Sequence, residues 1–173
     1  MKKLNNKSNI ILTGMPGAGK STVGVIVAKE LMKSFIDTDL LIQSGEGKRL
    51  DEIISSSGMK HFLALEEQYL MKLSAVSSVI STGGSAIYSS LSMKKLATSG
   101  IVIHLDLDLS EIIKRFSCMD ERGVARTPGQ TMESLYKERL PLYKTYADIS
   151  IDCNGLPPGE IKEKICSLIS TST

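Results

Sequence analysis

The residues whose types and spacing most clearly indicate chemistry run from Gly14 to Ser21, with the sequence Gly-Met-Pro-Gly-Ala-Gly-Lys-Ser. They fit the phosphate-loop pattern G-x-x-x-x-G-K-[ST] at every fixed position. In such a loop, glycines let backbone N–H groups approach phosphate, and the N-terminus of the next helix adds positive potential. We expect Lys20 to reach the β- and γ-phosphates and the Ser21 hydroxyl to ligate Mg²⁺. The stretch predicts nucleoside triphosphate binding; the alternative is a chance glycine-rich turn.

The segments on either side of this loop have the character that the motif requires. Asn9–Thr13 is a short apolar run of strand type, and Thr22–Leu31 carries an apolar stripe at helical spacing. A strand, a glycine-rich turn and a helix form the expected context. The predicted nucleotide-binding residues are therefore Gly14, Met15, Pro16, Gly17, Ala18, Gly19, Lys20, Ser21 and Thr22.

Two carboxylates follow the next predicted strand, Phe35–Asp39. Asp37 and Asp39 are two residues apart, so in an extended chain both side chains point to the same side. Beside a triphosphate site, one could hold the metal, directly or through a water molecule, and the other could take a proton from an acceptor hydroxyl. The alternative is that Asp39 caps a helix that starts at Leu40.

Strand-type and helix-type segments alternate along the rest of the chain. Residues 117–130 contain glycines and a proline among polar residues, without periodicity, and predict a mobile loop. Strands separated by helices indicate an α/β fold whose five-stranded parallel sheet is covered on both faces. Beyond residue 40 we expect helices over 50–57, 60–75, 91–98, 110–116, 132–143 and 159–169, and strands over 78–82, 101–107 and 148–153. The predicted helix over 60–75 carries four apolar residues on one face: Phe62, Leu65, Tyr69 and Leu73.

A glycine pair, Gly83-Gly84, follows the third predicted strand. In parallel sheets, ligands bind at the C-terminal ends of the strands. That rule brings the phosphate loop, the two aspartates and the glycine pair to one edge of the sheet. The pair either lets backbone N–H groups approach a ligand closely or forms a plain turn.

Several cationic and imidazole side chains remain to be assigned. Arg115 and Arg122 flank the start of the 117–130 loop, where an arginine on a mobile lid can neutralise charge on transferring phosphate. Isolated surface arginines are the alternative. Arg139, near the end of a helix, can complement the helix dipole. His61 and His104 are expected to be structural or surface residues.

Composition sets limits on the class of protein. A chain of 173 residues with 42% hydrophobic and 23% charged residues suits one globular domain. The net charge of +2 argues against a large nucleic-acid-binding surface. No apolar run approaches the roughly 18 residues of a membrane span. We expect a cytoplasmic monomer with a small-molecule acceptor, no nucleic-acid or membrane partner, and reduced thiols at Cys118, Cys153 and Cys166.

The ordered set of motifs resembles the shikimate kinase family over almost the entire chain. The shared segments are 14–22, 35–39, 81–84 (Ser-Thr-Gly-Gly) and 138–143 (Glu-Arg-Leu-Pro-Leu-Tyr), with Ala147-Asp148 behind them. The phosphate loop is common to many NTPases, but the ordered set with its spacing is specific. The resemblance implies a single domain, 1–173, with a three-layer α/β/α P-loop kinase fold like that of nucleoside monophosphate kinases. It also implies a closing lid at roughly 117–130 and an acceptor-binding region at roughly 40–75.

The resemblance implies an ATP-dependent kinase that phosphorylates the 3-hydroxyl of shikimate. By it, Ser21 and Asp37 would serve Mg²⁺, while Asp39 would bind the acceptor and act as the base. The acceptor would also be held by Gly83, Gly84 and Arg139.

The resemblance also assigns the adenine site and the lid. Arg115 would lie along adenine, and the loop 155–158, which ends at Pro158, would pass its other face. Arg122 would be the lid arginine and would act in catalysis with Lys20.

Three departures from the family pattern concern the acceptor site and the lid. The family usually shows Phe-Arg-x-x-Glu, where this chain has Phe62-Leu63-Ala64-Leu65-Glu66. Losing that arginine removes a charge-assisted contact to the shikimate carboxylate, worth about 1.5–3 kcal/mol or ten- to a hundredfold in binding. Lys60 and Arg126 are candidates to replace it. Ser85 takes the place of a third glycine, and Gly123-Val124-Ala125 follows Arg122 where Pro-Leu-Leu is common.

Two other functions stay open at this point. One is a kinase of the same family that acts on another hydroxylated acid or sugar acid. The other is a nucleotide-binding regulatory protein, which would not need Asp39, Arg139 and the glycine pair together. A large exposed apolar patch beside the lid would favour the regulatory function. The sequence also leaves GTP open as the donor.

Overall fold

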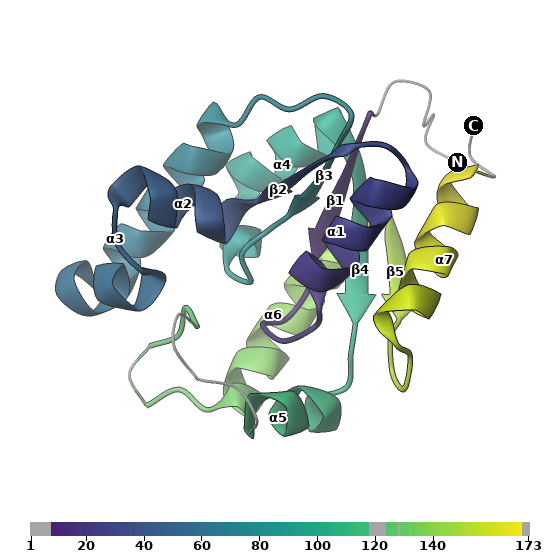
Figure 1. Cartoon of the computed structure of the whole chain (residues 1–173). Helices are drawn as coiled ribbons and strands as arrows, with labels where there is room; N and C mark the ends of the chain where they lie inside the picture. Colours follow the sequence, from purple (N-terminus) through teal and green to yellow (C-terminus); the bar gives the residue numbers. More distant parts are fainter. Residues whose placement is uncertain (1–7, 118–123, 128, 171–173) are drawn as a thin grey trace.

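The sheet has five parallel strands in the order β2-β3-β1-β4-β5 (Figure 1). The computed structural model describes residues 8–117, 124–127 and 129–170. Its strands are β1 (Asn9–Thr13), β2 (Ser34–Asp37), β3 (Ser78–Ser81), β4 (Gly100–Asp106) and β5 (Ile149–Asp152). The predicted five-stranded parallel sheet is confirmed, and each predicted strand is present with shifts of one to two residues at its ends.

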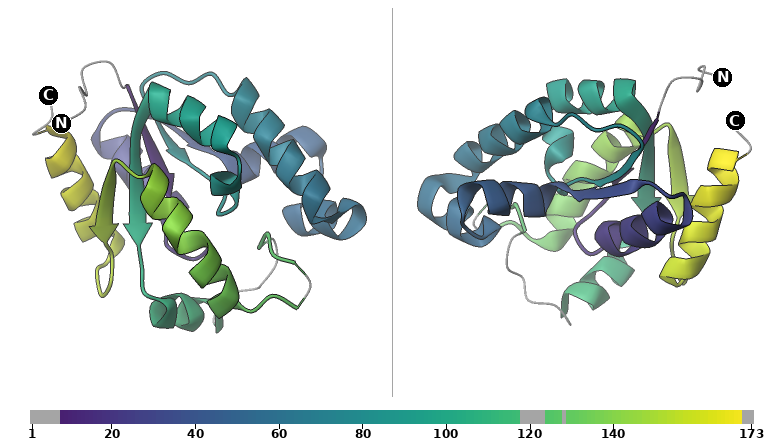
Figure 2. Two further views of the ribbon diagram at one scale, coloured as in Figure 1. Left: turned by 180° about the vertical axis from the view of Figure 1, so that it is seen from behind. Right: turned by 45° about the horizontal axis from the view of Figure 1, so that its top comes forward.

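Helices cover both faces of this sheet and extend past one edge. They are α1 (Lys20–Glu30), α2 (Thr38–Glu46), α3 (Leu50–Lys72), α4 (Ser90–Ser99), α5 (Leu109–Ser117), α6 (Met132–Tyr146) and α7 (Pro158–Ser170), with a short 3₁₀ helix, η1 (Ala86–Tyr88). Figures 1 and 2 show α1 and α7 against one face and α4 and α6 against the other, which gives three layers. The pair α2 and α3 lies beyond the β2 edge (Figure 1).

The central strands form the core because both of their faces are covered. Ile10, Ile11 and Leu12 of β1 are at most 2% exposed. Near-continuous apolar runs of this kind are expected of strands buried on both faces. At the start of β1, the Asn9 side chain donates to the carbonyl of Ala75 (2.7 Å) and accepts from the backbone N–H of Ser78 (3.0 Å), which ties β1 to β3. Within the described ranges, every helix is too short or too polar to cross a membrane.

The segment after β2 differs from the sequence prediction. The strand ends at Asp37 rather than Asp39, and Thr38–Glu46 is a helix that the periodicity did not reveal. Asp37 Oδ1 accepts from the backbone N–H of Asp39 (3.0 Å) and Leu40 (3.4 Å), so Asp37, and not Asp39, caps the helix. Two otherwise unpaired N–H groups gain a partner in this way. Placing both carboxylates on an extended strand was therefore wrong.

The long helix α3 bends where two separate helices were predicted. Gly58 has φ 81° and ψ 163°, outside the helical region, and the second part ends at Lys72 rather than at residue 75. The predicted apolar face is only partly buried. In this part of the helix the buried residues are Phe62, Glu66 and Leu70. A separate small hydrophobic cluster links α2 and α3 to the 124–127 segment; its buried members are Ile42, Leu50, Ile53, Phe62 and Ala125.

Candidate active site

The C-terminal ends of β1, β2 and β3 meet at a cavity of about 570 Å³. Loop residues Pro16 to Thr22 line one part of its wall, together with Arg115 and Pro158, and Asp39, Gly84 and Arg139 also line it. Because these residues come from separate parts of the chain, their meeting at one edge of the sheet confirms the expected grouping of the phosphate loop, the aspartates and the glycine pair.

The phosphate loop presents a buried cation. Gly17 and Gly19 have φ of 78° and 91°, a backbone conformation that favours glycine. Lys20 is 8% exposed, and its Nζ donates to the carbonyls of Gly14 (2.9 Å) and Met15 (3.0 Å). Burial lowers the pKa of Lys20 to about 8, against the opposing charge of Asp39. A desolvated ammonium gains strongly from an anionic ligand such as a phosphate group.

A hydroxyl and a carboxylate beside the loop fit a magnesium site. Ser21 Oγ donates to Asp37 Oδ2 at 2.6 Å, while Oδ1 of the same carboxylate caps α2 and fixes its orientation. Among the described residues, no three His, Cys, Asp or Glu side chains form a cluster that could hold a metal by themselves. Mg²⁺ in phosphoryl-transfer sites typically takes one or two protein oxygens and completes its shell with phosphate and water. The Ser21–Asp37 pair meets that requirement.

Two carboxylates, the half-buried Asp39 and the buried Glu66, flank Gly83. A Cβ atom at position 83 would lie 2.4 Å from Glu66 Oε1 and 2.6 Å from Asp39 Oδ1, so a larger residue there would displace both carboxylates. Burial raises the pKa of Asp39 to about 6, with Lys20 opposing the rise and Asp37 adding to it. Burial raises the pKa of Glu66 to about 7. A carboxylate with a pKa of about 6 is ionised at neutral pH and is basic enough to accept a proton.

Arg139 is the most deeply buried cation at this end of the cavity, at 1% exposure. Its Nη2 donates to the carbonyl of Ala125 and its Nε to the Tyr88 hydroxyl (3.1 Å). Its Nη1 has no hydrogen-bond partner within the described part of the chain and lies next to Gly84. Buried polar groups are rarely left unpaired, so Nη1 indicates a place for an anionic or carbonyl ligand. Dipole capping does not explain Arg139, since α6 continues to Tyr146.

The other end of the cavity is suited to a flat base. Arg115 of α5 donates from Nη1 to the carbonyl of Gly17 (3.1 Å), and Phe116 lies against the same glycine. Opposite them, Leu156, Pro158 and Ile161 contribute apolar wall. Arg122 and half of the predicted lid (118–123 and 128) fall outside the described residues, so their roles stay predictions. Val124 and Ala125 line the cavity, whereas Lys60 and Arg126 are not among the residues of its wall.

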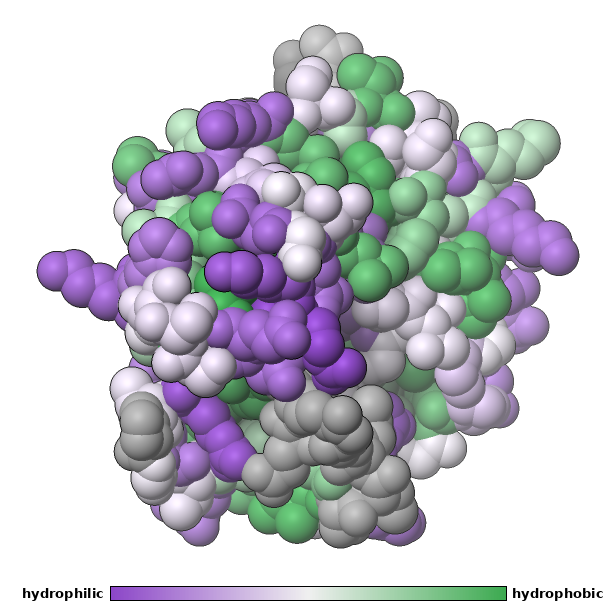
Figure 3. Space-filling view, turned by 60° about the vertical axis from the view of Figure 1, so that its left-hand side comes forward, coloured by the Kyte–Doolittle hydropathy of each residue, from purple (hydrophilic) through white to green (hydrophobic). Residues whose placement is uncertain are grey.

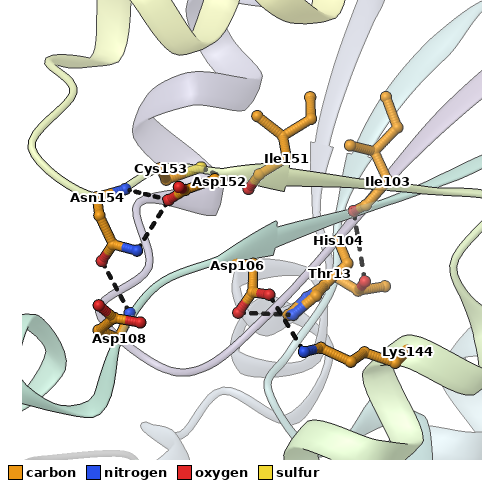
Figure 4. A network of polar contacts seen from close by, with 10 residues as sticks. All are labelled: Thr13, Ile103, His104, Asp106, Asp108, Lys144, Ile151, Asp152, Cys153 and Asn154. Atoms are coloured by element: carbon orange, nitrogen blue, oxygen red, sulfur yellow. Dashed lines mark hydrogen bonds and ion pairs between the residues drawn. The ribbon is translucent and has the colours of Figure 1, made fainter.

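Next to the residues that support the glycine turn, His104, Asp106 and Lys144 form a polar network (Figure 4). Tyr143 donates to the carbonyl of Gly84 (2.6 Å), and His104 stacks on Tyr143 with ring centroids 5.0 Å apart. His104 Nε2 lies 3.6 Å from Asp106 Oδ1, and Lys144 Nζ lies 3.5 Å from Oδ2. Burial lowers the pKa of His104, which favours its neutral form. His104 is thus a structural residue, as expected.

Sequence reasoning left Glu66 and Tyr143 without roles. Tyr143 stands inside the segment Glu-Arg-Leu-Pro-Leu-Tyr, but nothing local shows that its hydroxyl reaches Gly84, 59 positions away. Glu66 lies on the buried face of α3, between Phe62 and Leu70. A single acidic residue among apolar positions of a helix was the signal that could have indicated a functional role for it.

Comparisons with known proteins agree with this geometry. Residues 16–170 match the family model described as shikimate kinase. A shikimate kinase of Thermodesulfovibrio yellowstonii is 34% identical over 160 residues, covering 91% of this chain and 92% of that protein. The solved structure of shikimate kinase from Acinetobacter baumannii in complex with shikimate has a TM-score of 0.86 and 30% identity, covering 99% of this chain and 98% of the other. Threonine synthase-like 1 of Homo sapiens is 35% identical over 164 residues, which are 22% of its length.

Proposed function

The chain belongs to the shikimate kinase family, and we propose that it transfers the γ-phosphoryl group of ATP to the 3-hydroxyl of shikimate, giving 3-phosphoshikimate and ADP. One observation supports this most strongly: a single cavity holds the phosphate loop together with Asp39 and Arg139. A site that only binds or hydrolyses a nucleotide does not require a carboxylate base and a buried guanidinium beyond the phosphate loop.

In this proposal the phosphate loop binds and orients the donor. Its backbone N–H groups and Lys20 hold the triphosphate, and Arg115 and Pro158 enclose the adenine. Ser21 and Asp37 would hold Mg²⁺, which when bound draws negative charge from the phosphate oxygens. Asp37 is already oriented for this by its cap of α2. Arg122 would add positive charge from the lid.

Asp39 is proposed to take the proton of the acceptor hydroxyl. The hydroxyl oxygen forms a bond to the γ-phosphorus while the bond from that phosphorus to the β–γ bridging oxygen breaks, and the electron pair leaves with ADP. The proton moves from the hydroxyl to Asp39, whose pKa of about 6 keeps it ionised and ready at neutral pH. Lys20, which favours the ionised form of Asp39, also stabilises the negative charge on the phosphoryl oxygens.

Arg139 is proposed to bind the carboxylate of shikimate through its unpartnered Nη1. We expect Arg139→Met to raise KM for shikimate about ten- to a hundredfold and to change KM for ATP by less than about threefold. The methyl ester of shikimate, which lacks the negative charge, tests the contact directly in a steady-state assay of ADP release. The ester should be a poorer substrate than the acid for the wild type, and nearly as good as the acid for the variant.

Lys137→Met is the matched control, because Lys137 lies on the same helix but is exposed and paired with Glu133. It should leave both KM values unchanged. If Arg139→Met discriminates between acid and ester as strongly as the wild type, Arg139 does not bind the carboxylate.

Leu63 and Ser85 give a specific reason to test a second acceptor class. Neither Lys60 nor Arg126 is among the residues of the cavity wall, so the structure offers no described replacement for the family arginine. A panel of other hydroxylated acids belongs in the same assay, and a better substrate among them would replace shikimate while keeping the kinase function.

Among the described residues, the face that presents α2 and α3 gives no support to the regulatory alternative. On the face that presents α2 and α3, hydrophobic residues lie in spots separated by hydrophilic ones (Figure 3). The most exposed large hydrophobic side chains, Met32, Val76 and Leu40, belong to different segments. A cytoplasmic monomer without a nucleic-acid or membrane partner stays a prediction from composition.

A further inference from the structure

Two of the departures from the family pattern meet at one buried carboxylate, that of Glu66. Ser85, which stands in place of a glycine, donates from Oγ to Glu66 Oε2 at 2.7 Å, and both residues are 2% exposed. Leu63, which stands in place of an arginine, precedes Glu66 by three residues on α3. Leu63, Glu66 and Ser85 line the same recess of about 260 Å³. The recess leaves room for a longer side chain at position 63.

Ser85 is the main local contact that favours the ionised form of Glu66. Burial raises the pKa of Glu66, and the hydrogen bond from Ser85 is the largest opposing influence. The other charged groups that act on it are Asp39, which raises the pKa further, and Arg139 and Lys20, which lower it. The neighbouring Glu67 accepts from the Ser89 hydroxyl, away from this contact.

The second oxygen of Glu66 is positioned beside the proposed base. Within the described residues, Oε1 is buried and has no hydrogen-bond partner. A Cβ atom at Gly83 would lie 2.4 Å from this oxygen and 2.6 Å from Asp39 Oδ1, so both oxygens face the same glycine. A carboxylate oxygen in that state requires a hydrogen-bond donor. Arg139 Nη1, also buried and unpartnered, requires an acceptor.

We propose that Ser85 is a positioning residue that holds Glu66, a task that an arginine at position 63 could perform from the same recess. Its hydroxyl holds one oxygen of Glu66, so that the other accepts a hydrogen bond from a second hydroxyl of the acceptor, beside the hydroxyl that Asp39 deprotonates. This inference rests on the proposed function. It explains why Leu63 and Ser85 occur together in a chain that keeps Asp39, Glu66 and Arg139.

A double-mutant cycle tests whether the two side chains can perform the same task. Ser85→Ala removes the hydroxyl and should raise KM for shikimate about tenfold while leaving KM for ATP within about twofold. In the Leu63→Arg background, where a guanidinium can hold Glu66 from the recess, the same Ser85→Ala change should cost less than about twofold. Ser78→Ala is the control, because it removes a buried hydroxyl that bonds the carbonyl of Val76 at the far end of β3.

A second readout does not depend on turnover. The pKa of Glu66, followed by carboxyl ¹³C NMR without ligands, should rise in Ser85→Ala and fall in Leu63→Arg. The inference is overturned if Ser85→Ala raises KM for shikimate equally with leucine and with arginine at position 63. It is also overturned if the pKa of Glu66 does not change in these variants. If the wild type does not phosphorylate shikimate, the proposed function fails, and the NMR titration still decides whether Ser85 controls Glu66.

Discussion

Lys20→Ala is expected to lower kcat for phosphoryl transfer by about a thousandfold, which is the scale of losing a charged group that stabilises a transition state. Lys20 is the buried cation of the phosphate loop, and its ammonium is held at the loop carbonyls where phosphate oxygens are expected. Because burial lowers its pKa to about 8, the charged form is costly in the folded protein, and the alanine variant should remain folded. The measurement is kcat from ADP release, with the melting temperature recorded alongside.

The matched control for Lys20→Ala is Lys29→Ala, at the other end of the same helix. Lys29 is exposed and belongs to the last turn of α1, so its loss should change kcat by less than about twofold. Full activity in Lys20→Ala would mean that the phosphate loop does not have the role assigned to it.

Asp39→Asn is expected to lower kcat by about a hundred- to ten-thousandfold while sparing ATP binding. The amide keeps the size of the side chain but cannot accept the hydroxyl proton. In the wild type, kcat/KM for shikimate should rise with pH through about 6, because Asp39 acts in its ionised form. This dependence of kcat/KM on pH should be missing from the residual activity of the variant. Equal loss of ATP binding and transfer would instead mean that Asp39 serves the metal or the fold.

The same substitution should make the protein more stable at neutral pH. The pKa of Asp39 is raised from 3.8 to about 6 in the folded state, so its ionised form is disfavoured by folding. The cost, up to about 3 kcal/mol, is fully present above pH 6, shrinks as the pH falls, and disappears below the unfolded pKa of 3.8, where Asp39 is protonated in both states. Chemical denaturation should therefore show a gain in the free energy of unfolding for Asp39→Asn at pH 7 that shrinks at pH 4.

Prediction from the sequence succeeded where a structure depends on residues that are close together in the chain. The phosphate loop is a contiguous pattern of glycines, Lys20 and Ser21, and its flanking strand and helix follow from apolar runs and periodicity. The rule that ligands bind at the ends of parallel strands then placed the aspartates and the glycine pair at the same cavity. These steps need no knowledge of distant contacts.

The sequence failed where contacts between distant residues decide the outcome. Helix α2 was missed for a different reason: its cap by Asp37 is local, but the apolar pattern of nine residues is too short to show a helix. The buried position of Glu66 depends on Ser85, 19 residues away, and that of Arg139 depends on Tyr88 and Ala125. Such partners belong to other elements, so neither spacing nor propensity reveals them.

The most direct test of the central claim is ADP release by the purified protein in Mg²⁺-ATP, with and without shikimate, together with the mass of the product. We expect release that depends on shikimate, and a product heavier than shikimate by one phosphoryl group, formed in equal amount to ADP. ADP release at the same rate without shikimate, with no phosphorylated acid, would contradict the claim that this site couples the phosphate loop to Asp39 and an acceptor hydroxyl.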